Sequence, residues 1–260
     1  MAAIILSGGN NRRIGRDKAF LEVDRRTIIE REIEVLSRVF SRIIVVTNSP
    51  ERYTHLDVDL TSDIVPGKGP LGGIYTGLTF SSDSCNFVVG CDLPFLNAGL
   101  IDYMKGLSDR YDVIVPKIGD FMETLYAFYS KECLNSIEAR IEKNDLRIRS
   151  FFQEVRVRHI DKGEIEKFGP EGITFFNVNT EEKLSSARIL AEDVIERGVD
   201  LERHAHPNAL PEYTGNNLAI RGLGRFSLHY GSHCYDVLHG FAIGLNGEKS
   251  RLDLVIECAT

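Results

Sequence analysis

Apolar and polar positions alternate in blocks that predict strands and helices following one another along most of the chain. Short apolar runs that end in Gly, Asn, Asp or Pro predict buried strands. They lie at residues 2–6, 43–46, 86–91 and 112–116, with weaker strands within 56–64 and 155–160. Helical spacing predicts helices over 27–40, 74–80, 100–107, 131–143 and 185–197. Alternating strands and helices predict an α/β fold, a three-layer sandwich with a mostly parallel central sheet.

Two glycine-rich segments interrupt this alternation. The first, residues 6–18, follows the first strand and reads LSGGNNRRIGRDK. The second, residues 66–73, reads PGKGPLGG and is predicted as a loop before the helix at 74–80. Glycines let backbone N–H groups close on an anion. The first segment adds four cations, namely Arg12, Arg13, Arg16 and Lys18. It therefore predicts a polyphosphate cradle, although a glycine turn with solvated arginines is the simpler alternative.

The spacing of the first segment excludes two other phosphate loops. A P-loop needs Gly-Lys-Ser/Thr, whereas Lys18 follows Asp17 and precedes Ala19. A dinucleotide fingerprint needs Gly-x-Gly-x-x-Gly, which Gly8, Gly9 and Gly15 do not form.

Polar residues follow three predicted strands: Asn48, Asp63 and Asp92. In parallel sheets, ligands bind at the carboxyl ends of the strands, so we expect these side chains to meet the first loop. A carboxylate beside bound phosphates suits Mg²⁺, which binds one or two carboxylates plus phosphate oxygens. Asp92 is therefore the predicted metal ligand, with a turn-forming role before Leu93-Pro94 as the alternative.

Composition narrows the class of protein. The net charge of −7 argues against a general nucleic-acid or membrane surface, and no apolar run approaches a membrane span. The five cysteines show no zinc-like pairing, and the chain enters a strand at once, so we expect a cytoplasmic protein.

Four blocks together resemble the molybdenum cofactor guanylyltransferases. The family opening, LAGGxSxRMGxDK, is similar to residues 6–18, and residues 69–74 (GPLGGI) are similar to the family's GPLAGI. Residues 91–95 (CDLPF) and 176–180 (FNVNT) also match, the latter predicted to end a strand and start a helix capped by Thr180. The chain departs from the family at Ser7, Asn11 and Ile14, and residues 122–126 lack the family's proline.

The resemblance implies a Rossmann-like fold of the nucleotide-diphospho-sugar transferase type and assigns roles to residues. The implied GTP-binding residues are Leu6, Ser7, Gly8, Gly9, Gly15, Lys18, Asn48, Asp63, Gly69 and Asp92. The implied catalytic residues are Lys18, Arg13 and Asp92, with Asp92 holding Mg²⁺. Asn177 and Asn179 would lie on the acceptor side or near the metal.

The implied reaction transfers GMP from GTP to the terminal phosphate of molybdenum-molybdopterin and releases pyrophosphate. GTP and the molybdopterin cofactor are the implied ligands, and molybdoenzyme maturation proteins are further candidate partners. Two alternatives stay open: a cytidylyl or sugar-phosphate nucleotidyltransferase, and a non-catalytic carrier of GTP or cofactor.

The residue composition of the chain changes near residue 200, so we expect a nucleotidyltransferase domain at 1–199 and an extension at 200–260. The extension holds five of the seven histidines, together with Cys234 and Cys258. Their spacing matches no zinc site, which favours a loop-rich segment with scattered histidines. One strand is predicted at 252–256.

Overall fold

The computed structural model describes residues 1–8, 17–169 and 171–196, together with six strands between residues 219 and 257. Predictions on Gly9, Arg13 and Gly15 lie outside the described residues.

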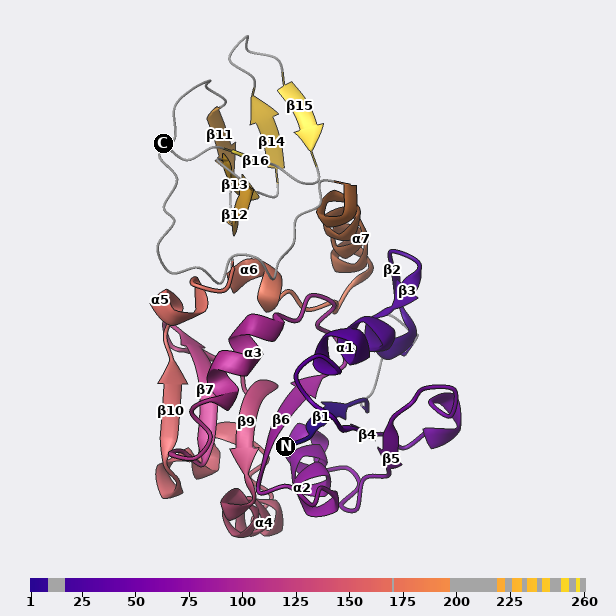
Figure 1. Ribbon diagram of the computed structural model, residues 1–260, viewed down its shortest axis with the longest axis vertical. Coiled ribbons are helices and arrows are strands. Elements are labelled where there is room, and N and C mark those ends of the chain that lie inside the picture. The colour runs from indigo at the N-terminus through magenta and orange to yellow at the C-terminus, as the bar shows by residue number, and fades with distance from the viewer. Residues whose placement is uncertain are drawn as a thin grey trace.

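A central eight-stranded sheet organises the first part of the chain. Its order is β10-β7-β9-β6-β1-β4-β5, with β8 paired to β7. Figure 1 shows this row from β10 on the left to β5 on the right. The strands are β1 (Ala3–Leu6), β4 (Ile43–Val46), β5 (Asp59–Thr61), β6 (Cys85–Gly90), β7 (Val113–Ile118), β8 (Phe121–Met122), β9 (Tyr126–Ser130) and β10 (Val157–Ile160).

The predicted mostly parallel sheet is confirmed. Strand β1 pairs in parallel with β4 and with β6, β4 with β5, and β10 with β7. Strand β9 runs antiparallel to both β6 and β7, within an apolar segment to which the sequence pattern assigned no element. Because β9 runs antiparallel to β7, the chain passes from β7 to β9 through the short strand β8, without a helical crossover.

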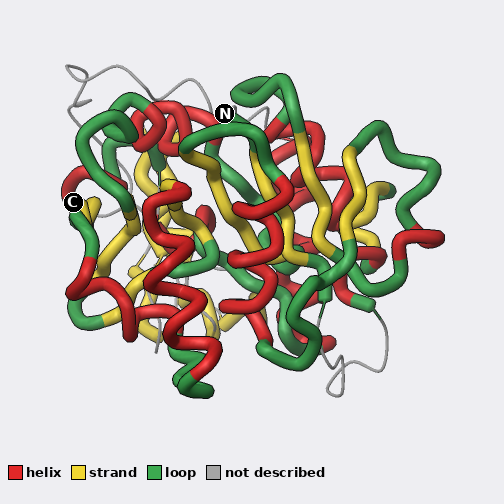
Figure 2. The backbone as a smooth tube through the Cα atoms, turned by 90° about the horizontal axis from the view of Figure 1, so that it is seen from below, coloured by secondary structure: helices red, strands yellow, loops and turns green. Residues whose placement is uncertain are grey.

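Helices cover both faces of the sheet, which confirms the three-layer arrangement. Helices α1 (Ile28–Leu36) and α3 (Ala98–Lys105) pack into one core cluster, and α2 (Gly69–Phe80) and α4 (Leu134–Glu142) pack into the other. Figure 1 shows α1 and α3 above the strands and α2 and α4 below them. Figure 2 shows helices on both sides of the strands.

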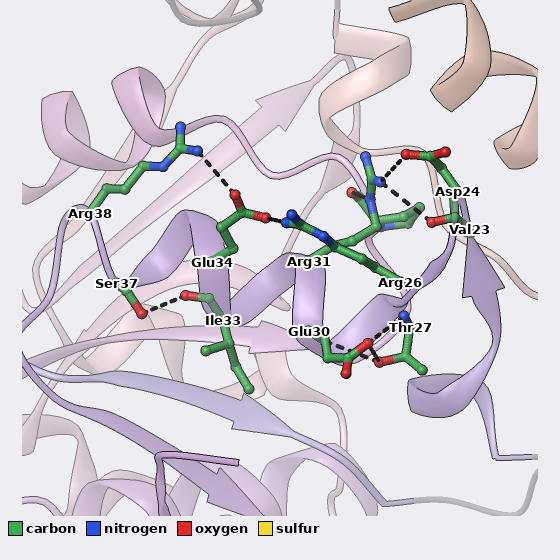
Figure 3. Close-up of polar contacts among 11 residues, drawn as sticks. Val23, Asp24, Arg26, Thr27, Glu30, Arg31, Ile33, Glu34, Ser37 and Arg38 are labelled. Carbon is green, nitrogen blue, oxygen red and sulfur yellow. Dashed lines mark hydrogen bonds and ion pairs between the residues drawn. The ribbon is translucent and has the colours of Figure 1, made fainter. Parts of the chain in front are cut away.

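Local side-chain interactions stabilise helix α1 near both of its ends. Thr27 and Glu30 form a capping box, in which each side chain binds the other's backbone N–H. Glu34 pairs with Arg26 and with Arg38, so ion pairs line the outer face of the helix (Figure 3).

The prediction that residues 66–73 form a loop is wrong in its second half, because α2 already begins at Gly69. Pro70 suits the first turn of a helix. Farther along, a Cβ at Gly77 would lie 2.6 Å from Cγ2 of Ile4, and one at Gly73 would lie 3.2 Å from Leu6. The glycines therefore let α2 lie directly on β1, which is a packing role and not a loop signal.

The prediction of a strand ending at residues 175–179 is also wrong. Residues 175–179 form no strand, and they follow the short helix α6 (Glu171–Thr174). The predicted cap is confirmed, since Thr180 Oγ1 accepts a hydrogen bond from Lys183 N at 3.2 Å at the start of α7 (Glu181–Glu196). Helix α7 and Val178 belong to a third core cluster with the β2–β3 ribbon (Glu22–Val23, Arg26–Thr27).

Six further strands lie between residues 219 and 257. They are β11 (Ala219–Gly222), β12 (Phe226–Tyr230), β13 (His233–Val237), β14 (Gly240–Ile243), β15 (Lys249–Leu252) and β16 (Ile256–Glu257). Among the described strands they pair only with one another, as two antiparallel three-stranded sheets. The single strand predicted at 252–256 is wrong, because Leu252 ends β15 and Ile256 begins β16 in the other sheet. Within the described residues, no helix has the length and apolarity needed to cross a membrane.

The smaller elements among the described residues are four 3₁₀ helices and one further short α-helix. They are η1 (Lys18–Phe20), η2 (Pro50–Arg52), η3 (Lys131–Cys133), η4 (Ile148–Glu154) and α5 (Lys162–Ile165).

Candidate active site

The carboxyl ends of β1, β4 and β6 meet at the site. Hydrogen bonds continue the sheet past the strand ends: Ser7 N donates to Val46 O at 2.9 Å, and Cys91 N donates to Leu6 O at 3.2 Å. These bonds fix the starts of the two loops side by side. Leu6 and Ser7, which begin the first glycine-rich segment, therefore lie beside the start of the turn that contains Asp92.

Lys18 lies at the centre of this edge. Its Nζ is 3.3 Å from Oδ2 of Asp92 and also donates to Oδ1 of Asn179. Val178 N donates to the backbone oxygen of Asp92 at 2.9 Å, which ties the third segment to the same turn. The Lys18 and Asp92 side chains are 22% and 26% exposed, so both remain open to a ligand. Three residues far apart in the chain thus converge on one point.

Helix α1 holds the Asp92 turn through two hydrogen bonds. Oε1 of Glu32 accepts a hydrogen bond from Leu93 N at 3.2 Å. The neighbouring Arg31 donates through Nε to Pro94 O at 3.2 Å. Two successive helix residues therefore fasten two successive residues of the turn, and the sequence pattern had marked neither Arg31 nor Glu32 as part of the site.

Glu32 is a fully buried carboxyl group with one oxygen unused. Its Oε2 has no hydrogen-bond partner, and the side chain is 0% exposed. Burial raises the pKa of Glu32 well above its ordinary value, and the negative charge of Asp92 adds to this rise. The Leu93 hydrogen bond lowers the pKa and only partly offsets the burial. Glu32, which holds the Asp92 turn, therefore favours its neutral, protonated form.

A buried hydroxyl contact supports the start of the glycine-rich loop. Tyr53 OH lies 2.5 Å from Oγ of Ser7, and the two residues are 0% and 5% exposed. Burial raises the pKa of Tyr53 to about 12, while its hydrogen bonds to Ser7 and Thr47 lower the pKa. Because Thr47 follows β4 and Ser7 follows β1, Tyr53 links the ends of two strands.

The residues around Tyr53 also hold the far end of the loop. Arg52 Nη1 lies 2.6 Å from Oδ2 of Asp17, and its guanidinium stacks 4.3 Å from the Phe20 ring centroid. The Phe20 and Tyr53 ring centroids are 5.0 Å apart. The short 3₁₀ helix η2 and its following Tyr53 thus contact the described residues on both sides of the loop. We call this arrangement, made by Arg52 and Tyr53, the loop clamp.

Asn48 and Asp63, both expected at this edge of the sheet, contact each other. Oδ1 of Asn48 accepts a hydrogen bond from Asp63 N at 3.2 Å. Oδ1 of Asp63 in turn accepts from Thr76 Oγ1 at 2.9 Å and from Val65 N at 3.2 Å. Asp63 therefore connects β5 to α2, and Gly69 opens that helix with a φ of +61°.

Asn177 lies apart from the centre of the site. Its Oδ1 accepts a hydrogen bond from Lys183 Nζ at 3.0 Å, at the start of α7. The structure thus separates the two asparagines of the fourth block, because only Asn179 contacts Lys18 among the described residues.

Glu123 is a further carboxyl group at this edge that sequence reasoning missed. Its backbone is held between Pro116 O and Tyr126 N, both at 3.0 Å, in the segment that links β8 to β9. Burial, followed by the charge of Asp92, raises the pKa of Glu123 to about 7. No spacing rule marks it, since its place near Asp92 depends on the unpredicted antiparallel strand β9.

The donor set suits a hard divalent cation. The centre offers the Asp92 carboxylate and the Asn179 amide oxygen, and magnesium prefers oxygen ligands. Among the described residues, no three His, Cys, Asp or Glu side chains gather into a metal cage. Such an open arrangement fits an ion that takes its remaining ligands from substrate phosphates.

Comparison with known proteins shows what the chain is similar to. A family model described as the MobA-like NTP transferase domain matches residues 3–160. A probable molybdenum cofactor guanylyltransferase of Peptoclostridium acidaminophilum is 36% identical over 190 residues, covering 70% of this chain and 86% of the relative. The molybdenum cofactor guanylyltransferase of Desulfosudis oleivorans is 34% identical over 189 residues, covering 72% of this chain and 94% of the relative.

Solved structures agree with this likeness. Molybdopterin-guanine dinucleotide biosynthesis protein A from Archaeoglobus fulgidus is 25% identical with a TM-score of 0.67, covering 74% of this chain and 100% of its own. The 2-C-methyl-D-erythritol 4-phosphate cytidylyltransferase from Thermus thermophilus has a TM-score of 0.56 over 73% of this chain and 98% of its own. At 17% identity, the second similarity shows the fold alone.

The raised pKa of Glu32 predicts that its contribution to the stability of the fold depends on pH. With its pKa raised above the ordinary 4.5, Glu32 keeps its proton in the folded state where the unfolded chain has lost it. Its contribution to stability is therefore present at low pH and is lost as the pH rises toward the folded pKa. We expect Glu32→Gln, which keeps the acceptor oxygen, to match the wild type near pH 5 and to gain relative stability by pH 8.

Urea unfolding at the two pH values measures this difference. Glu22→Gln, at an exposed carboxyl on β2, is the matched control for loss of one acidic group. Glu32→Ala, which removes the Leu93 bond, is expected to lose about 1–3 kcal/mol. An equal free-energy gap between Glu32→Gln and wild type at both pH values would contradict the assignment.

Proposed function

The chain belongs to the MobA-like NTP transferase family, and on that premise we propose that it transfers GMP from GTP to the terminal phosphate of molybdenum-molybdopterin. Its relatives named molybdenum cofactor guanylyltransferase, at 34–36% identity over most of their length, support this activity. The observation that carries the residue assignment is the meeting of Lys18, Asp92 and Asn179 beside the first glycine-rich loop.

The reaction breaks one bond and forms one. A terminal phosphate oxygen of molybdopterin attacks the α-phosphorus of GTP, and the bond from that phosphorus to the bridging oxygen of the β-phosphate breaks. The electron pair leaves with pyrophosphate, and a phosphoanhydride joins the two halves of the dinucleotide. Because the attacking phosphate is already anionic, the reaction needs no strong general base, and the protein acts by positioning and charge neutralisation.

The contacts of Lys18 support a role at the phosphates. Its ammonium group has three donors, and the two contacts to Asp92 and Asn179 leave one for a phosphate oxygen. We assign Lys18 to the leaving pyrophosphate, with Arg13 of the same loop as a second cation. Asn179, and more distantly Asn177, face the acceptor side in this proposal.

The family typically uses a divalent metal, and we propose Asp92 as the residue that would hold Mg²⁺. When bound, the ion would neutralise phosphate charge at the reacting centre. The turn that carries Asp92 is fastened to α1, which keeps the carboxylate in place before a ligand arrives.

The nucleotide itself would lie over the ends of β1, β4 and β5. Backbone groups of Leu6, Ser7 and Gly8 would line the guanine and ribose side, and Gly9 and Gly15 would approach the phosphates. Asn48, Asp63 and Gly69 sit at the neighbouring strand and helix ends and complete this proposed subsite. The choice of guanine over cytosine rests on the resemblance of the first block to the guanylyl family.

The remaining assignments extend this proposal. We place the nucleotidyltransferase domain at residues 1–199 and treat 200–260 as an appended extension, which the separate pairing of β11–β16 supports. A cytoplasmic location fits the free thiols of Cys85, Cys91 and Cys133. Molybdoenzyme maturation proteins are the proposed recipients of the product.

Substitutions at the centre test the residue assignments. Asp92→Ala is expected to abolish turnover, because the ligand of the metal is lost. Lys18→Ala is expected to lower kcat roughly 100- to 1,000-fold, the range for loss of one group that stabilises developing charge. Asp109→Ala and Lys167→Ala remove exposed charges elsewhere and serve as controls. Pyrophosphate release from GTP is the measurement, and near-wild-type transfer by Asp92→Ala would refute the metal assignment.

The loop clamp generates a second prediction. Tyr53→Phe removes only the hydroxyl that contacts Ser7, so we expect a loss of about 1 kcal/mol in stability and a raised KM for GTP with little change in kcat. Tyr111→Phe, a partly buried tyrosine outside the site, is the control. Steady-state kinetics and thermal unfolding separate the two effects. An unchanged KM for GTP in a Tyr53→Phe variant that has lost stability would show that the contact is only structural.

A further inference from the structure

A second concentration of positive charge lies outside the site described above. A cleft of about 340 Å³ is formed where α4 ends and the 3₁₀ helix η4 (Ile148–Glu154) follows. Its lining residues are Arg140, Asp145, Arg147, Arg149, Ser150 and Gln153. We call it the arginine cleft. Neither the proposed reaction nor the glycine-rich blocks use these residues.

The arginines of the cleft are only partly neutralised. Arg147 binds Asp145 through two hydrogen bonds of 2.9 and 3.1 Å, and Arg140 pairs with Glu154. Arg149 forms no ion pair with any described residue, and its side chain lies at the surface. Three guanidinium groups therefore face two carboxylates, and an excess positive charge remains at the cleft.

Two polar groups of the cleft are buried without a partner. Nε of Arg140 and Oγ of Ser150 have no hydrogen-bond partner, although both atoms are shielded from solvent. Native proteins rarely leave such groups unpaired, because a buried donor without an acceptor costs free energy. Arg140 and Ser150 both line the cleft, and an acceptor is the group that each of these donors lacks.

We propose that the arginine cleft binds a phosphoryl group. Guanidinium groups bind phosphate oxygens with two parallel N–H donors, and a serine hydroxyl adds a third hydrogen-bond donor. The cleft has room for a phosphate and for part of the molecule that carries it. A carboxylate carries two oxygens and a single charge, whereas a phosphoryl group presents three oxygens and up to two negative charges to the guanidinium groups.

The cleft adjoins the second glycine-rich block. Asn144, next to Asp145, accepts a hydrogen bond through Oδ1 from Lys68 Nζ at 3.1 Å. Lys68 precedes α2, whose first residue is Gly69. A phosphoryl group in the cleft would thus be held near the helix that borders the proposed nucleotide subsite. Its source is either the phosphate of the acceptor, which rests on the proposed function, or a free phosphate anion.

Calorimetric titration of the full chain with inorganic phosphate tests the proposal. Saturating Mg²⁺ and GTP are present throughout, so that the nucleotide subsite is blocked. We expect one phosphate to bind per wild-type chain, and Arg149→Gln and Ser150→Ala to weaken it about tenfold each. Arg110→Gln, which removes an exposed arginine elsewhere, is the control.

Stability provides a readout that separates ligand binding from structure. Ser150→Ala removes an unsatisfied buried hydroxyl, so its thermal midpoint without phosphate should equal or exceed that of the wild type. A variant that keeps its stability while losing phosphate affinity supports a ligand-binding role. Absence of phosphate binding in the wild type, or equal affinity in wild type and Arg149→Gln, overturns the proposal.

Kinetics then distinguish the two sources of the phosphoryl group. A raised KM for molybdopterin with unchanged KM for GTP in Arg149→Gln identifies the acceptor phosphate. Unchanged KM values with weakened phosphate binding identify a free phosphate anion. Because the calorimetric arm requires no turnover, failure of guanylyl transfer would leave the phosphate result intact, and the two proposals can fail separately.

Discussion

The parallel pairing of β1 between β4 and β6 is the constraint on which the rest of the structure depends. Ala3 lies opposite Ile43 on one side and Phe87 on the other, and Leu6 lies opposite Val46 and Gly90. This register ends the three strands at one level, so the loops that follow them start side by side. A shift in register would part the glycine-rich loop from Asp92 and leave Lys18 without its two partners.

Beneath that edge, buried polar contacts hold the loops in place before any ligand binds. Glu32 and Arg31 fasten the Asp92 turn to α1, and the loop clamp made by Arg52 and Tyr53 contacts both sides of the glycine-rich loop. Glu32 and Tyr53 are fully buried, so they act on the loops and not on a ligand directly. Their effect is to fix the charges of Lys18 and Asp92, because preorganised charges in a partly desolvated site stabilise a transition state without reorganisation.

The sequence predicted the parts of the site that depend on local chemistry. The first loop, Asn48, Asp63 and Asp92 all follow apolar strands, and the rule for parallel sheets predicted that they share one edge. Two contacts agree with this prediction, Lys18 with Asp92 and Asn48 with Asp63. The prediction failed where tertiary packing decides: the glycines at 69–73 suggested a loop, yet Gly73 lies within α2, where a Cβ would be 3.2 Å from Leu6. Glu32, Tyr53 and Glu123 were missed because their partners lie dozens of residues away, and no spacing rule encodes such pairs.

The most direct test of the account is pyrophosphate release by the full chain, measured with GTP and Mg²⁺ in the presence and absence of molybdopterin. The account predicts release that requires molybdopterin, proceeds with GTP and is far slower with CTP. Tight GTP binding without pyrophosphate release when molybdopterin is supplied would contradict it, as would equal release from CTP.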